Sequence, residues 1–142
     1  MRLGQCLKIK LDKGAIAPTR GHRWDAGLDL YATEDFVIGV GNRHTFDTGV
    51  HIDIEEGLVG YIKSRSGMMV RHGILTDGTI DAHYEGPIKV CLFNHGLVEY
   101  PVKAGDKIAQ LVILPCLLPD LELVDSLDDT DRGDCGFGST GR

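Results

Sequence analysis

The chain has 142 residues and a formal net charge of −6, a size that suits one domain with a sizeable buried core. It has no basic stripe of the kind that follows a nucleic-acid backbone, so we expect no nucleic-acid partner, although a small anionic ligand needs only a few local cations or backbone N–H groups. No apolar run approaches the roughly 18 residues of a membrane span, no signal peptide is visible and the cysteines lack zinc spacing, so we expect an intracellular protein with free thiols and no membrane partner.

The N-terminal half has the patterns of short strands. Residues 5–11 alternate apolar and charged side chains, as a half-buried strand does. The stretch AGLDLYA, residues 26–32, places Asp29 between two leucines. That acid is either a turn residue or a residue near a metal ion. Further strands are expected at 36–40, 44–54 and 58–63.

One short helix is expected from Met68 to His72, with Gly73 ending it. The residues before it, Ser66-Gly67, would present free N–H groups and a hydroxyl to an anion, with Arg65 adding positive charge. An ordinary N-cap explains the same residues. The local pattern leaves both interpretations open.

The middle of the chain has a strong hairpin signal. Asp77-Gly78 stands between the short runs 74–76 and 79–81, which predicts a type I′ turn because Gly accepts its positive φ. The hairpin ends in Asp81, and Tyr84 follows three residues later. The stretch therefore predicts either a small site or a surface hairpin with a solvated acid and a packed tyrosine.

The C-terminal half continues with strands. Residues 107–114 are nearly all apolar, which predicts a strand buried on both faces. Gln110 inside it is then a buried amide that either has structural partners or contacts a ligand. From Arg132 the chain is rich in glycine yet contains Phe137. Further strands are expected at 87–94, 97–102 and 121–124.

These elements predict one all-β domain. Many short strands, glycine-rich turns and one short helix are typical of a jelly-roll-like barrel. We place this domain at residues 1–126. Residues 127–142, which begin in an acidic stretch, would form a flexible arm.

Five separated stretches then resemble one family. AGLDLYA, SRSGM, GTIDAHYEG, GDKIAQLV and RGDCGFGSTG, in this order, are similar to the five motifs of the trimeric dUTPases, the deoxyuridine triphosphate pyrophosphatases. The resemblance implies hydrolysis of dUTP to dUMP and pyrophosphate, with Mg²⁺ and with water attacking the α-phosphorus. This reaction limits uracil in DNA and supplies dUMP. It also implies a homotrimer with shared active sites.

The resemblance implies a role for each matched residue. Asp81 matches the general base, Tyr84 the ring that packs under deoxyribose, and Asp29 the acid that supports the hydration shell of Mg²⁺. Ile80 would flank the sugar, and the backbone around Gly78 would read uracil. The phosphate chain would be held by Arg65, Ser66, Gly67 and Gln110. The arm closing over γ-phosphate and base would use Arg132, Phe137, Gly138 and Ser139.

The chain departs from the family pattern at two of these stretches. Ser64 stands where the family usually has proline, and Glu85 stands where it usually has arginine. Two other functions remain open: a related dCTP deaminase, and a dUTPase-like module that binds a protein partner. We expect a cytoplasmic protein, or a nuclear one if its source is eukaryotic.

Overall fold

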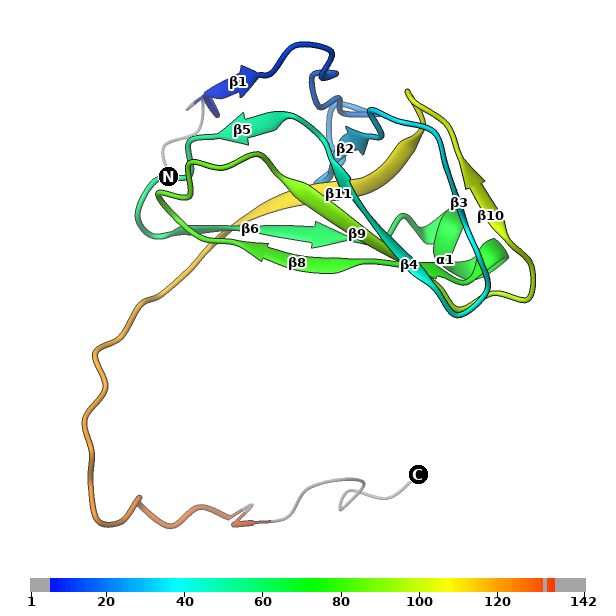
Figure 1. Cartoon of the computed structure of the whole chain (residues 1–142). Helices are drawn as coiled ribbons and strands as arrows, with labels where there is room; N and C mark the ends of the chain where they lie inside the picture. Colours follow the sequence, from blue (N-terminus) through cyan, green and yellow to red (C-terminus); the bar gives the residue numbers. More distant parts are fainter. Residues whose placement is uncertain (1–5, 132, 135–142) are drawn as a thin grey trace.

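The computed structural model describes residues 6–131 and 133–134, and in them short strands surround one short helix (Figure 1). The elements are β1 (Ile9–Leu11), β2 (Leu28–Tyr31), β3 (Phe36–Ile38), β4 (Arg43–Asp47), β5 (Val50–Ile52), β6 (Leu58–Lys63), α1 (Ser66–His72), β7 (Ile74–Leu75), β8 (Asp77–Ile80), β9 (Lys89–Asn94), β10 (Tyr100–Val102) and β11 (Lys107–Pro115).

All strand pairs between named elements are antiparallel, and they form separate small sheets. The largest sheet has the order β2-β11-β6-β8, and a second has the order β4-β9-β7. The pairs β1-β5 and β10-β3 complete the described part. The jelly-roll-like all-β class is confirmed, but these strands do not close into one continuous barrel, and β8 is an edge strand.

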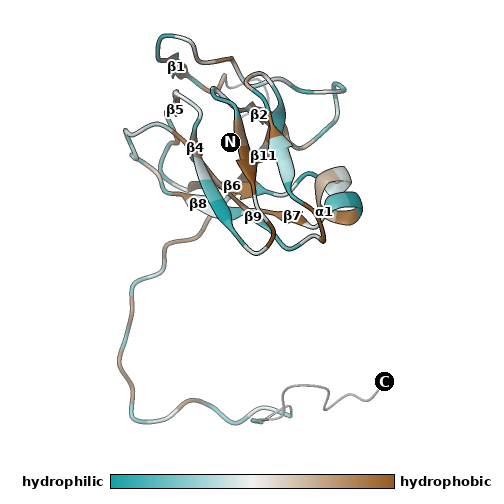
Figure 2. Ribbon diagram, turned by 45° about the vertical axis from the view of Figure 1, so that its right-hand side comes forward, coloured by the Kyte–Doolittle hydropathy of each residue, from teal (hydrophilic) through white to brown (hydrophobic). Residues whose placement is uncertain are grey.

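The core follows the alternation seen in the sequence. In β9, Val90 and Leu92 are buried, whereas Lys89 before them is exposed and Cys91 between them is half-buried. In Figure 2, much of β6 and β7 has the hydrophobic colour, in keeping with their place inside the molecule. The expected short helix is also present, and Gly73 ends it in the left-handed conformation that suits a glycine at this position.

The predicted hairpin at Asp77-Gly78 is wrong. Both residues lie inside β8, where Asp77 pairs with Lys63 and Gly78 with Ile62 of β6. The run before them, β7, pairs with β9 in the other sheet. The chain therefore crosses from one sheet to the other at Thr76, because β6 and β9 offer longer strands to pair with than β7 and β8 offer each other.

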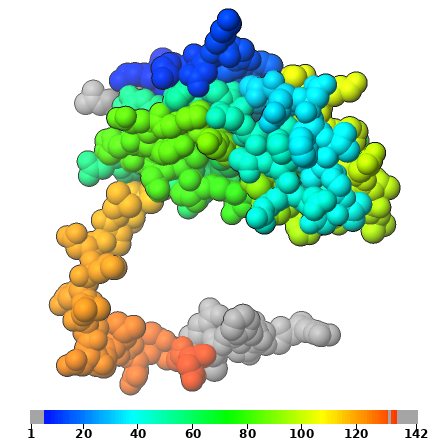
Figure 3. Space-filling model, in the orientation of Figure 1, coloured from blue at the N-terminus to red at the C-terminus, as the bar shows by residue number. Residues whose placement is uncertain are grey.

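Two further strand predictions need correction. The strand expected at 44–54 is divided into β4 and β5 by Thr48 and Gly49, since Gly49 has a φ of 64°. The strand expected at 121–124 does not form, because after β11 the chain leaves the body without a neighbouring strand (Figures 1 and 3). The apolar side chains of this departing segment are exposed: Leu117, Leu118, Leu121, Leu123, Val124 and Leu127.

In the part of the chain that the structure describes, no helix has the length and apolar character needed to cross a membrane.

Candidate active site

Five of the predicted site residues line one polar pocket of about 510 Å³ near α1, and four of them carry side chains: Asp29, Arg65, Ser66 and Gln110. Gly67 belongs to the same lining. The sequence analysis missed two further cations there, Arg71 of α1 and Lys107 of β11. Three positive side chains around one hollow can neutralise a ligand that carries several negative charges.

Asp29 is held by two of these cations. Lys107 Nζ lies 2.7 Å from one carboxylate oxygen, and Arg65 Nε lies 3.5 Å from the other. The hydrogen bond to Asp29 raises the pKa of the Lys107 ammonium above its ordinary value. Arg65 also donates to the Lys107 carbonyl oxygen at 3.0 Å. The contacts with Asp29 and with the Lys107 carbonyl oxygen together fix the Arg65 side chain at the pocket wall.

Register brings Gln110 into this pocket. In the large sheet Gln110 of β11 pairs with Asp29 on one side and with Lys63 on the other. Its Nε2 donates to the Ser64 carbonyl oxygen at 3.1 Å. A Cβ on Gly27 would lie 2.3 Å from Gln110 Oε1. Glycine at position 27 therefore makes room for this amide, a role that the sequence analysis did not assign.

Ser64, the first departure from the family pattern, has a defined role. Its hydroxyl donates to the Thr76 carbonyl oxygen at 2.9 Å and accepts from the Thr76 N–H at 2.8 Å. Thr76 is buried. The serine thus ties the segment before the helix to the crossing between β7 and β8, with bonds that a proline side chain cannot make.

The start of α1 is open to the pocket. Arg65 is the N-cap residue, no side chain in the described part of the chain caps the helix, and its first turn contains no acidic residue. The interpretation of Ser66 as an ordinary N-cap is therefore wrong, because Ser66 is already helical.

Asp81 lies in a different hollow, of about 360 Å³, whose lining also includes His83 and Cys116. The carboxylate is on the exposed residue that follows β8. Ile80 beside it is only 8% exposed and packs in the core. The residues expected to contact the sugar thus lie at and after the end of a strand that is anchored in the core.

The loop after Asp81 presents Tyr84 at the surface. The tyrosine is 42% exposed, and its hydroxyl donates to the Pro87 carbonyl oxygen at 3.2 Å. A Cβ on Gly86 would lie 2.3 Å from that hydroxyl oxygen, so glycine is needed there. His83 has a φ of 64°, an uncommon value for a residue with a side chain, and it reverses the chain before the tyrosine.

The two sets of site residues lie at opposite ends of β6. Ile80 pairs with Gly60, so Asp81 is level with Val59, whereas Ser64 follows the last residue of the strand. From Val59 to Ser64 the backbone advances by five residues of extended strand, a distance of about 16 Å. Figure 1 shows β6 running toward α1 while β8 runs away from it. One chain does not bring Asp81 and the polar pocket together.

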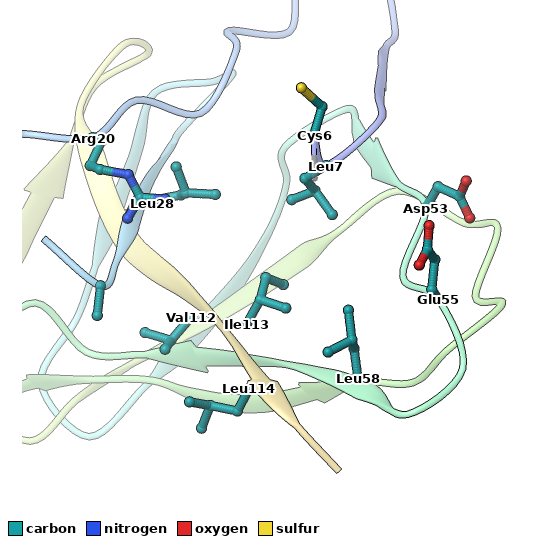
Figure 4. A pocket seen from close by; sticks show the side chains of 11 residues that line it. Cys6, Leu7, Arg20, Leu28, Asp53, Glu55, Leu58, Val112, Ile113 and Leu114 are labelled. Atoms are coloured by element: carbon teal, nitrogen blue, oxygen red, sulfur yellow. The ribbon is translucent and has the colours of Figure 1, made fainter. Parts of the chain in front are cut away.

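A third hollow, of about 380 Å³, is mostly apolar (Figure 4). Figure 4 shows Arg20 on one side and Asp53 and Glu55 on the other. Its apolar lining comes from the N-terminal segment and the large sheet: Leu7, Ala26, Leu28, Leu58, Val112, Ile113 and Leu114.

The predicted arm residues Arg132, Phe137, Gly138 and Ser139 lie outside the described residues.

Comparison with known proteins gives one consistent result. The family model of the dUTPases matches residues 13–141. The deoxyuridine 5′-triphosphate nucleotidohydrolase of Corynebacterium glutamicum is 50% identical over 139 residues, which cover 94% of this chain and 93% of the relative.

Solved structures agree with this result. The dUTPase of Staphylococcus bacteriophage 80alpha, determined with dUpNHpp, is 31% identical and superimposes with a TM-score of 0.90 over 96% of this chain and 99% of its own. A dUTPase mutant of the S. aureus phage phi11, described with a structural Mg(II) ion, is 29% identical, with a TM-score of 0.80 over 86% of this chain and 98% of its own. With the matching family model and a relative half identical over nearly all its length, the chain belongs to the dUTPases, the hydrolases of deoxyuridine triphosphate.

Proposed function

We propose that the chain hydrolyses dUTP to dUMP and pyrophosphate in a site built from more than one copy of itself. The observation that carries this proposal is the separation of Asp81 from the cationic pocket by most of the length of β6. A carboxylate base about 16 Å from the groups that hold the phosphates cannot act on the α-phosphorus within one chain. A neighbouring copy supplies the missing half.

The polar pocket would bind the phosphate chain. Arg65, Arg71 and Lys107 balance its negative charge, and the uncapped start of α1 offers N–H donors. Gln110 adds an amide that is already oriented by its bond to Ser64. Fixed donors of this kind stabilise the charge that shifts to the leaving pyrophosphate.

Mg²⁺ fits this pocket as a partner of the phosphates. The described residues contain no group of three or more His, Cys, Asp or Glu side chains that would hold the ion. Mg²⁺ commonly binds through substrate phosphates and one or two carboxylates while keeping several waters. The Asp29 oxygen that faces Arg65 at 3.5 Å is the less tightly held of its two, and it would accept from a water on the ion. The ion would supply charge neutralisation.

Strand β8 would read the base. It is the edge of its sheet, so alternate residues direct backbone N–H and C=O groups away from β6. A donor-acceptor pattern that fits uracil rejects cytosine, whose 4-amino group puts a donor where an acceptor is required. Gly78 keeps this part of the strand free of a side chain. Tyr84, exposed beyond the strand end, would pack under deoxyribose and leave no room for a 2′-hydroxyl.

Asp81 would take the proton from the attacking water. Its carboxylate stands on an exposed residue at the end of a buried strand, so it can face a ligand without losing its anchor. A positioned carboxylate base contributes roughly 10²–10⁴-fold to such a reaction.

Two features support assembly into a closed oligomer, for which we propose a trimer. The apolar hollow of Figure 4 and the exposed leucines after β11 are surfaces that a second copy would cover. A chain that reaches from its own body to a neighbour forms a head-to-tail contact, and such contacts close into a ring when the rotation between copies closes. The site halves then meet at each contact.

We extend the proposal to the C-terminal residues. Residues 127–142 would form an arm in which Phe137 stacks on uracil while Arg132, Gly138 and Ser139 approach the γ-phosphate. A chain that lacks residues 131–142 would then keep its fold and its oligomeric state but lose kcat/KM by orders of magnitude. A truncated chain with full activity would remove the arm from the mechanism.

Pyrophosphate release from dUTP, dCTP, dTTP and UTP tests the function. We expect turnover of dUTP far above the other three, loss of turnover with EDTA and recovery with Mg²⁺. Ammonia release from dCTP would indicate a deaminase instead. Equal kcat/KM for UTP and dUTP would remove the role given to Tyr84. In Tyr84→Ala, the difference in kcat/KM between dUTP and UTP should become smaller.

A further inference from the structure

His51 makes two hydrogen bonds that join distant parts of the chain. It lies in β5 between the buried residues Val50 and Ile52, and its own side chain is 16% exposed. Its Nδ1 lies 2.7 Å from the Glu85 carbonyl oxygen, and its Nε2 lies 3.0 Å from Asp12 Oδ2. The ring therefore connects the N-terminal segment to the loop that carries Tyr84.

Both contacts require a proton on the ring. The Glu85 carbonyl oxygen can only accept, so Nδ1 must donate. The ionised Asp12 carboxylate also only accepts, so Nε2 must donate as well. A neutral imidazole carries one N–H and leaves a lone pair facing an oxygen at the other contact. Only the imidazolium form satisfies both partners.

On either side of the His51 bond, a backbone hydrogen bond ties the loop to β5 or to the residues directly after it. The His83 N–H donates to the Ile54 carbonyl oxygen at 3.2 Å, and the Ile88 N–H donates to the Val50 carbonyl oxygen at 2.8 Å. Between these points stand Tyr84 and Glu85, both at the surface. The His51 bond is the middle attachment, and it falls on the residue directly after the tyrosine.

We propose that His51 is a positioning residue that, when protonated, braces the loop carrying Tyr84 and so sets the affinity for the deoxyribose of the substrate. The proposal rests on the role given to Tyr84 under the proposed function. The second departure from the family pattern, Glu85, takes part through its backbone carbonyl.

The charged groups around the ring favour the protonated form. The Glu85 carbonyl bond is the largest influence, and with the bond to Asp12 it raises the pKa of His51 above 6.5. Burial of the ring lowers the pKa of His51, and Lys10, its partner across the β1-β5 pair, lowers it by less. Because the folded-state pKa is raised, both hydrogen bonds of the ring are fully present below pH 6.5, and one of them is lost as the pH rises through the folded-state pKa.

The pH dependence of KM for dUTP tests the brace. In the wild-type protein we expect KM to rise about fivefold as His51 loses its proton, the effect of one weakened hydrogen bond. His51→Asn retains an N–H donor near the position of Nδ1 and cannot titrate, so its KM should stay low across this range. His51→Phe should have the raised KM at every pH. In both variants kcat should change less than KM.

Two variants provide controls. Asp12→Asn removes the charged partner without touching the loop and should move the KM transition to lower pH. His44→Asn removes another histidine with a carboxylate partner, Glu34 at 3.0 Å, away from the loop. It should keep the wild-type transition. A wild-type KM transition that persists in His51→Asn would overturn the proposal.

Hydrogen exchange of the free protein separates this proposal from the assignment of Tyr84. We expect protection of the 83–86 amides to fall above the transition in the wild-type protein and to be independent of pH in His51→Phe. Changing protection without a change in KM would retain the brace and overturn its link to the sugar. Identical protection in all variants would overturn the brace itself.

Discussion

At the scale of single residues, the strongest assignment is that of Asp81 as the base. Asp81→Asn keeps the shape of the side chain but cannot take a proton from water. We expect kcat to fall by at least ~10²-fold while the substrate analogue dUpNHpp still binds. Steady-state kinetics and calorimetric titration measure the two effects.

The control for this variant is Glu34→Gln, which removes an exposed carboxylate paired with His44 outside the described pockets. It should leave kcat unchanged. Near wild-type turnover in Asp81→Asn would show that another group accepts the proton.

Single residues also show where sequence patterns stop being informative. Gly27 and Gly86 are ordinary turn residues by pattern, yet each gives space to one side chain of the proposed site, Gln110 or Tyr84. By pattern Lys107 is only the first residue of a strand, although its ammonium group forms an ion pair with Asp29. The roles of Gly27 and Lys107 depend on contacts with residues far away in the chain, and local patterns contain no record of them. Gly86 lies only two residues from Tyr84, but their contact depends on how that loop is folded.

At the scale of elements, Ser64 connects two segments that the site requires. Ser64→Ala removes both bonds to the buried Thr76 backbone. A buried backbone group left without a partner costs about 1–3 kcal/mol. We therefore expect a lower free energy of unfolding, by that amount, in denaturant titration.

Ser64→Thr keeps the hydroxyl and should recover most of this loss. An unfolding midpoint unchanged in Ser64→Ala would mean that Thr76 finds other partners. Thr76 Oγ1 is itself buried without a hydrogen-bond partner among the described residues, so few other groups at the crossing between β7 and β8 can replace the Ser64 bonds.

The elements that were predicted correctly are those decided by their own residues. Alternation placed Val90 and Leu92 in the core, and Gly73 ended the helix as expected. The Asp77-Gly78 hairpin failed because strand pairing depends on competing partners elsewhere in the chain. The strand at 121–124 failed for the opposite reason, since its pattern is strand-like but no neighbour lies beside it in one chain.

At the scale of the whole molecule, the motif order predicted the family correctly. It also suggests residues for the site, but the sequence could not give their arrangement. The register of β6 and β8 fixes Asp81 and the polar pocket at opposite strand ends. Shared active sites entered the sequence analysis only through the resemblance. The strand register now gives a physical reason for them.

Complementation between two inactive variants tests this account most directly. Asp81→Asn lacks the base, and Arg65→Ala lacks a phosphate-holding cation. Each should be inactive alone while forming the same oligomer as the wild-type protein. In equal mixtures assembled from unfolded chains, about a quarter of head-to-tail contacts join an intact Asp81 to an intact Arg65.

We therefore predict that the mixture regains about a quarter of wild-type turnover. A mixture of Asp81→Asn with the double variant Asp81→Asn/Arg65→Ala contains no intact site and should stay inactive. Turnover in the first mixture no higher than that of its two parents, with mixed oligomers demonstrated by mass, would contradict a site built from two chains.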